Sequence, residues 1–109
     1  MASLTEQDFR LEADRALEQA QRALLPLADQ EGFEVDLQNG VLQVVFDEPT
    51  AAKFVVSPNA PVRQVWVSAL TRSFKLSWES EASAFALDGE TLDTMLGRLA
   101  REHLTGQTG

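Results

Sequence analysis

Residues 33–46, FEVDLQNGVLQVVF, carry the clearest structural signal in the chain. Apolar and polar residues alternate on both sides of Asn39–Gly40, and a period of two is typical of a strand with one buried face. An Asn-Gly pair favours the type I′ turn that joins two antiparallel strands. The stretch predicts a β-hairpin with Glu34 and Asp36 facing outward. The core face of this hairpin is expected to carry Phe33, Val35, Leu37, Leu42, Val44 and Phe46.

Shorter strand patterns follow the hairpin. They lie at 53–57 (KFVVS), 63–69 (RQVWVSA), 74–78 (FKLSW) and 84–87 (AFAL). Pro58 and Pro61 separate the first two, and because a proline cannot donate to a strand ladder, we expect PNAP at 58–61 to end the first. The chain therefore predicts an antiparallel sheet of five to six strands.

Two amphipathic helix patterns flank the strands. Residues 5–28 repeat apolar side chains at three- and four-residue spacing, with Thr5 as a candidate N-cap and Pro26 as a stop signal at which the last turn ends early or kinks. Residues 88–104 begin with an Asp88–Gly89 turn and continue as a second helix. Its buried stripe is expected to be Leu92, Met95, Leu96, Leu99 and His103. Both helices must cover apolar surface, so we expect one domain over 1–109, an α+β two-layer sandwich with both helices on one sheet face.

The charge of the chain is unevenly distributed. The net charge is −8, and residues 1–48 carry all of it, with eleven carboxylates and three arginines. Binding to nucleic acid needs a basic surface, so it is not expected. The acidic half favours a cationic partner, either a protein or a metal, although such acids can also serve only to keep a protein soluble.

The absence of cysteine and of long apolar runs indicates the cellular compartment and limits the chemistry of the chain. There is no cysteine, which excludes disulfides and thiolate metal sites and fits a reducing compartment. The sequence has no apolar run of about 18 residues and no secretory signal, so no membrane association is expected. We expect a bacterial cytoplasmic protein, or a mitochondrial matrix protein only if a transit peptide has been removed.

Catalytic signals are weak. The single histidine, His103, lies in the last turn of the second helix, where a histidine commonly interacts with the helix dipole or edges a buried stripe. No nucleophile elbow, phosphate-binding loop or dinucleotide fingerprint accompanies it. The sequence therefore favours a binding or assembly protein over an enzyme.

Any metal site in this chain must use carboxylate and water oxygens, which suit hard cations and are compatible with ferrous or ferric iron. Glu34 and Asp36 lie on the same strand face about 7 Å apart, at ~3.3 Å per residue. That spacing suits a weak, exposed, multi-ion surface. The full candidate set is Asp14, Glu18, Asp29, Glu31, Glu34 and Asp36. A solvated acidic face is the alternative interpretation.

Trp66 is out of phase with the core of its strand. In QVWVSA, residues 64–69, Val65 and Val67 face the core, so the tryptophan faces the other side together with Gln64 and Ser68. Exposed aromatics are enriched at binding hot spots, and the two polar neighbours offer hydrogen bonds at a rim. We expect a partner-binding surface here. The alternatives are that a loop or the N-terminal tail covers the ring, or that a bulge reverses the phase.

Several segments together resemble the frataxin family, whose bacterial members are the CyaY-type proteins. They are EADRAL in the first helix, VDLQNGVLQVVF in the hairpin, P-x-x-QVWV-S at 61–68, F-x-L-x-W at 74–78 and FALDGETLDTML at 85–96. The resemblance covers about residues 9–104. It implies a role in iron–sulfur cluster assembly, through contacts with a cysteine desulfurase and a scaffold protein, and a fold that matches the sandwich expected above.

The resemblance also implies roles for individual residues. Gln64 and Trp66 match the family's Q-x-W motif, which contacts the scaffold, and Asn59 in the preceding turn is a looser match. Acidic positions of the family's iron-binding ridge fall on Glu18, Asp29, Glu34 and Asp36. The dense carboxylate cluster further along the family's first helix is replaced by Gln21, Arg22, Leu25 and Pro26, and its frequent early histidine by Arg10. The sequence therefore predicts iron bound only weakly at surface carboxylates, by a monomer.

A different class remains as the alternative: a small acidic chaperone of the secretion type that binds a cationic or apolar partner segment. Such chaperones interleave helices with strands and dimerise through a helix. The predicted helices here lie only at the chain ends, which favours the frataxin-like interpretation.

Overall fold

The computed structural model describes residues 4–106. It contains helices α1 (Glu6–Glu31) and α2 (Leu92–Thr105), a short 3₁₀ helix η1 (Ala60–Val62) and seven strands. The strands are β1 (Glu34–Gln38), β2 (Val41–Phe46), β3 (Ala52–Asn59), β4 (Gln64–Ala69), β5 (Arg72–Glu79), β6 (Ala84–Leu87) and β7 (Glu90–Thr91). Within the described part of the chain, no helix is long and apolar enough to cross a membrane. The expected domain limits, 1 and 109, lie outside the described residues.

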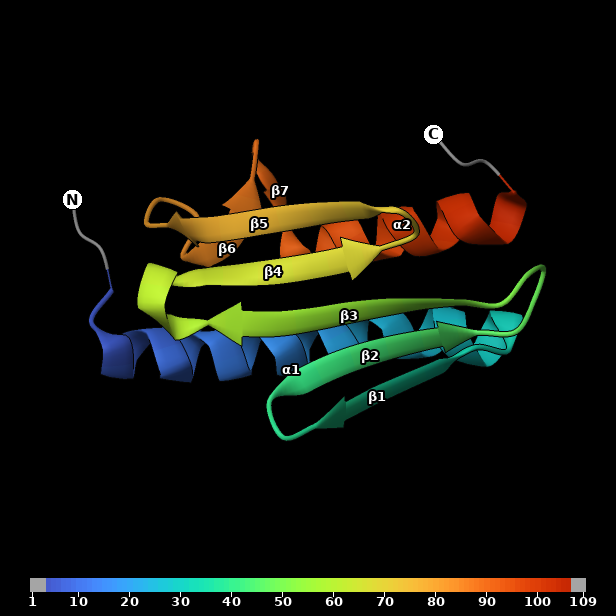
Figure 1. The fold of residues 1–109 in the computed structure, drawn as a ribbon, viewed down its shortest axis with the longest axis horizontal. Coiled ribbons are helices and arrows are strands. Elements are labelled where there is room, and N and C mark those ends of the chain that lie inside the picture. The colour runs from blue at the N-terminus through green and yellow to red at the C-terminus, as the bar shows by residue number, and fades with distance from the viewer. Residues whose placement is uncertain (1–3, 107–109) are drawn as a thin grey trace.

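The seven strands form one antiparallel sheet in chain order, β1 to β7 (Figure 1). Each strand pairs with the next, so the topology follows from a succession of short turns. At the first turn Asn39 and Gly40 both have positive φ angles, 54° and 74°, as a type I′ turn requires. That turn sets Leu37 opposite Leu42 and Val35 opposite Val44, which confirms the predicted core face of the hairpin.

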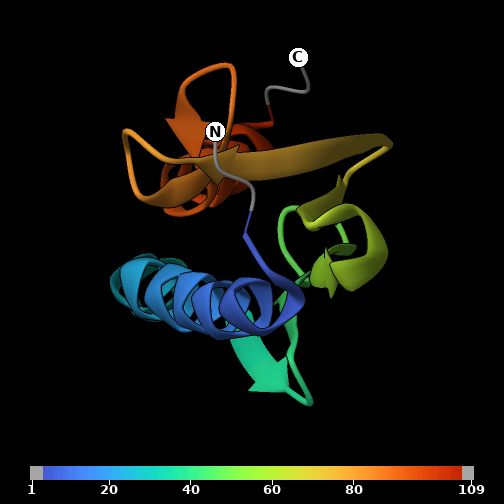
Figure 2. The same ribbon diagram turned by 90° about the vertical axis from the view of Figure 1, so that its left-hand side faces the viewer.

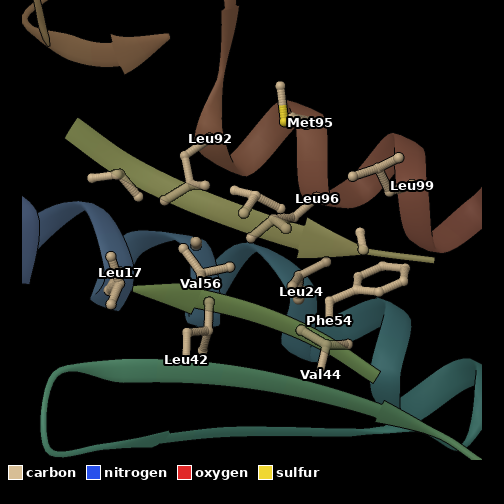
Figure 3. Packing of buried hydrophobic residues seen from close by; sticks show 14 of the residues in the cluster. Leu17, Leu24, Leu42, Val44, Phe54, Val56, Leu92, Met95, Leu96 and Leu99 are labelled. Atoms are coloured by element: carbon tan, nitrogen blue, oxygen red, sulfur yellow. The ribbon is translucent and has the colours of Figure 1, made fainter. Parts of the chain in front are cut away.

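Both helices cover the same face of the sheet and leave the other face bare. In Figure 1 the sheet lies in front of α1 and α2, and the end-on view of Figure 2 shows the two helices on one side. The predicted two-layer α+β sandwich is confirmed. Figure 3 shows Leu17 and Leu24 of α1, and Leu96 and Leu99 of α2, meeting Val56 and its neighbours from the sheet. Burial of these apolar side chains is the main force that holds the two layers together.

Helix α1 is longer than predicted. Thr5 caps it as expected, its hydroxyl oxygen accepting the Asp8 N–H at 3.1 Å. The predicted stop at Pro26 is wrong, because the helix continues to Glu31 and ends at Gly32, with φ 84°. Pro26 is exposed and removes only one N–H, whereas Ala28 beyond it continues the buried stripe. The helix therefore continues past the proline, and its buried stripe extends to Ala28.

Two strand boundaries also differ from the prediction. The proline expected to end β3 lies inside it, with Pro58 opposite Val65 of β4. Pairing of β3 with β2 ends at Val56, so the proline occupies a stretch with one neighbouring strand, where a missing N–H is tolerated. Residues 90–91 were expected to belong to the second helix, but they form the short strand β7. Asp88 and Gly89 have positive φ angles, 53° and 82°, and turn β7 back onto β6.

The buried stripe of α2 is as predicted, and it includes His103, which is 5% exposed. The His103 Nε2 lies 3.0 Å from the Thr50 carbonyl oxygen, so this nitrogen carries the proton and donates. The imidazole ring packs on Phe46 with centroids 4.6 Å apart. His103 therefore anchors the connection between β2 and β3 to the end of α2, which is a structural role.

A charged network on the other side of α2 fixes this helix to the last strands. The Arg98 guanidinium donates to both carboxylate oxygens of Glu90, at 2.8 and 2.9 Å, and to Glu102 at 2.8 Å. Arg72 reaches the same Glu102 at 3.4 Å. The hydrogen bond from Arg98 holds the pKa of Glu90 below its ordinary value of 4.5, against the smaller opposing effect of burial.

We expect Glu90→Gln to lower the free energy of unfolding by about 1 kcal/mol near pH 7, since part of the ion pair is screened by solvent. A carboxyl with a depressed folded pKa stabilises above its unfolded pKa and loses that effect as pH falls through the folded value. The gap between wild type and variant should therefore close below about pH 4.5. Urea unfolding across this range measures it, with the exposed Glu79→Gln as control; a gap that persists in acid contradicts the prediction.

Candidate partner-binding face and acidic surface

Trp66 lies on the bare face of the sheet, the face turned toward the viewer in Figure 1. Its side chain is 36% exposed, whereas Val65 and Val67 on either side are 0% and 1% exposed. The alternation predicted for QVWVSA is therefore confirmed, and neither a bulge nor a described loop buries the ring. A large aromatic presented by a regular strand is held at a fixed height and angle, which suits a binding anchor.

Two neighbours fix the indole in place. Its Nε1–H donates to Gln64 Oε1 at 2.9 Å, and the Lys75 ammonium lies 5.0 Å from the ring centroid. Gln64 in turn donates from Nε2 to Ser77 Oγ at 3.5 Å. Because the polar atom of the indole is satisfied within the chain, Trp66 offers a partner mainly its apolar ring, with one cation already beside it.

The register of β3, β4 and β5 brings the predicted partner-binding residues together. Across β3 and β4, Asn59 faces Gln64, Ser57 faces Trp66 and Val55 faces Ser68. Asn59, Gln64, Trp66 and Ser68 therefore share one surface, which we call the Trp66 face. Sequence reasoning missed Lys75, directly opposite Trp66, and the half-buried Val41, Val45 and Val55. Only the cross-strand register identifies the lysine as a neighbour, whereas the valines were visible as apolar residues on the outward phase.

The six candidate metal ligands are exposed, but they do not form one site. Glu34 and Asp36 occupy the same face of the edge strand β1, opposite Val45 and Gln43 respectively. The other four lie on α1, two in its first half and two at its C-terminal end: Asp14, Glu18, Asp29 and Glu31. None of the six takes part in a salt bridge within residues 4–106. They form an acidic surface without a salt bridge among the described residues.

This arrangement limits how a metal could be held. Residues 4–106 contain no group of three or more carboxylate or histidine side chains close enough to share one ion. A tightly held cation needs several oxygen ligands at 2–2.6 Å. The residues therefore do not fit a chelating iron site, and the acidic surface could attract iron only at separate, hydrated carboxylates.

The fold and the surfaces define a class: a two-layer α+β protein whose bare sheet face presents a fixed tryptophan and whose edge strand and first helix carry exposed acids. A family model described as Frataxin-like domain matches residues 2–106, and the chain belongs to the frataxin family. Among curated relatives, the iron-sulfur cluster assembly protein CyaY of Pseudomonas fluorescens (strain SBW25) is 32% identical over 105 residues, which cover 93% of this chain and 90% of the relative.

Further comparisons agree with this assignment. The iron-sulfur cluster assembly protein CyaY of Pseudomonas syringae pv. tomato (strain DC3000) is 34% identical over 104 residues, 92% of this chain and 89% of the relative. Among solved structures, a frataxin from Psychromonas ingrahamii superimposes with a TM-score of 0.67 and covers 96% of this chain and 95% of that one. At 17% identity, this last similarity concerns the fold.

Proposed function

We propose that this protein takes part in iron–sulfur cluster assembly as a non-enzymatic modulator that binds a cysteine desulfurase and the scaffold protein. The observation that carries the proposal is the Trp66 face, a fixed aromatic on a sheet face that the helices leave bare. The names of the curated relatives, iron-sulfur cluster assembly protein CyaY, support the process. The proposal includes action as a single-domain monomer in the bacterial cytoplasm.

The function is tested by reconstitution. Purified desulfurase and scaffold from the same cell are mixed with a sulfur donor and iron, and the rate of cluster formation is followed with and without this protein. We expect a saturable change in rate, of either sign, together with a stable complex in sedimentation. An unchanged rate and no complex at any protein concentration would contradict the proposal.

We also propose that the acidic surface binds iron weakly, as a mobile layer rather than in a cage. A surface rich in carboxylates raises the local concentration of cations without holding one tightly. The acidic surface lies along α1 and β1, whereas Trp66 lies on β4. Iron and the scaffold could then be held at the same time.

Titration with Fe(II) is therefore expected to broaden backbone NMR signals around Glu18, Asp29, Glu34 and Asp36 before those of the other acids. Replacing Glu34 and Asp36 together by Gln and Asn should remove the broadening on β1 and leave that at Asp29. The matched control is the pair Glu79→Gln and Glu81→Gln, exposed acids at the β5–β6 turn. Broadening spread evenly over all seventeen acids, or equally weakened by the control, would contradict a defined surface.

A further inference from the structure

A cavity of about 320 Å³ lies between α1, the turn after β5 and the start of α2, and its lining includes none of the six candidate metal ligands and no residue of the Trp66 face. Its walls come from three segments: the first half of α1, the turn between β5 and β6, and the start of α2. Of these segments, the beginning of α1 and the turn between β5 and β6 lie toward the viewer in Figure 2. The volume is at the lower end of the range for small-molecule sites.

The floor of the cavity is aromatic. Trp78 is half-buried there and meets the buried Phe85 edge-on, with centroids 5.2 Å apart and planes at 70°. Ala16 and Leu92 complete an apolar lining. The packing with Phe85 fixes the indole of Trp78, so its exposed part forms a rigid wall for a flat or apolar group.

A fixed carboxylate lies at the wall formed by α2. The Oδ1 of Asp93 accepts from the Thr91 hydroxyl at 2.7 Å and from the Thr94 N–H at 2.9 Å. Its Oδ2 accepts from Gln19 Nε2 at 3.4 Å, which links α1 to α2 across the cavity. Three hydrogen bonds therefore orient this carboxylate before any ligand arrives.

The other charged groups of the lining are Glu12 and Arg15, which pair with each other at 3.5 Å. The Arg15 side chain is 65% exposed, so it lies largely in solvent at the rim. The cavity thus combines two carboxylates, one solvated guanidinium and an aromatic floor, in a protein of net charge −8. The balance of charge favours a cation, and an aromatic floor adds cation–π attraction.

We propose that this cavity is a binding site for a small organic cation with an aromatic or apolar body, an arylalkyl amine in chemical terms. The body would lie against Trp78 and Leu92, and the ammonium would pair with Asp93. The proposal does not depend on the function proposed for the Trp66 face, because the two sites share no residue.

Trp78 provides the measurement, since Trp66 is the only other tryptophan in the chain. In a Trp66→Phe protein, the fluorescence of Trp78 is followed during titration with phenethylammonium, phenethyl alcohol or phenylpropionate. We expect a saturable change in fluorescence with phenethylammonium and no saturation with phenylpropionate. Phenethyl alcohol should bind at least about 10-fold more weakly than the cation, since a lost charge pair in a half-enclosed site is worth on the order of 1–2 kcal/mol.

Asp93→Asn keeps an oxygen for the Thr91 and Thr94 hydrogen bonds and removes the charge, so it should reduce the preference for the cation over the alcohol by about 10-fold. The matched control, Asp88→Asn, changes the net charge equally at an exposed turn outside the lining, and should leave the preference unchanged. The proposal is overturned by equal responses to all three probes, by no saturable response, or by equal effects of the two variants. If Asp93→Asn fails to fold, the comparison of the three probes still tests the proposal, because that comparison needs neither Asp93→Asn nor Asp88→Asn.

Discussion

Trp66→Ala is expected to weaken binding to the desulfurase–scaffold complex by on the order of 30- to 700-fold, which corresponds to about 2–4 kcal/mol for a central aromatic anchor. The ring supplies the only large apolar surface on β4 that the helices do not cover. The same change should cost about 1 kcal/mol or less in folding, since it removes the hydrogen bond to Gln64 and the contact with Lys75 at an exposed position. Calorimetric titration and urea unfolding measure the two quantities.

Two further variants distinguish the loss of the Trp66 ring as a binding anchor from the loss of any exposed or buried apolar side chain. Leu25→Ala removes another exposed hydrophobic, 43% exposed on α1, and should leave both binding and folding nearly unchanged. Val65→Ala removes a fully buried neighbour of Trp66 and should destabilise the fold by about 1–3 kcal/mol without removing the anchor. A large loss of thermal stability in Trp66→Ala, or a loss of binding in Leu25→Ala as great as in Trp66→Ala, would reject the Trp66 face.

Phe46→Ala is expected to lower the free energy of unfolding by about 3–5 kcal/mol, a large part of the 5–15 kcal/mol typical of a domain. Phe46 is 1% exposed and contacts three rings, with centroid distances of 4.6 Å to Phe33, 5.0 Å to Phe54 and 4.6 Å to His103. Its removal opens a void bounded by Phe33 before β1, by β3 and by α2. The surrounding backbone is tied by strand pairing and cannot close the void.

Urea unfolding followed by circular dichroism measures this cost. Leu11→Ala, at a side chain that is 52% exposed on α1, is the control and should change stability by less than about 0.5 kcal/mol. A loss below about 1 kcal/mol in Phe46→Ala would mean that the four-ring cluster rearranges to fill the space. The assignment of this end of the core would then be wrong.

Most features that depend on residues close together in the sequence were predicted correctly, whereas several that depend on contacts between distant segments were not. Alternation in 33–46 and 64–69 predicted which side chains are buried, because a strand's two faces differ only in phase. Two wrong predictions concern prolines, whose local effect on a helix or strand was expected to end the element. In the structure, contacts with other segments extend each element beyond its proline. Pro26 was expected to stop α1, yet the buried stripe continues through Ala28, and Pro58 was expected to end β3, yet it pairs with Val65.

The candidate site shows the same division. Trp66 was identified from its phase, which also placed Gln64 and Ser68 on its face, and the structure adds the hydrogen bond from the indole to Gln64 and the neighbouring Lys75. The acids could be counted but not grouped, because their distances depend on how α1 lies against β1. The structure leaves them as a dispersed surface over the described residues, which is why weak binding of iron remains the proposal.

The sequence by itself determined the period of each strand, the Asn39–Gly40 turn, the two amphipathic helices and the charge imbalance, because each depends on residues within a few positions of one another. Only the tertiary structure decided that Lys75 lies beside Trp66 and that Asp93 meets Gln19 over the floor made by Trp78. Those contacts join segments up to 74 residues apart. They are set by strand register and helix packing, which the whole core fixes together and no single segment encodes.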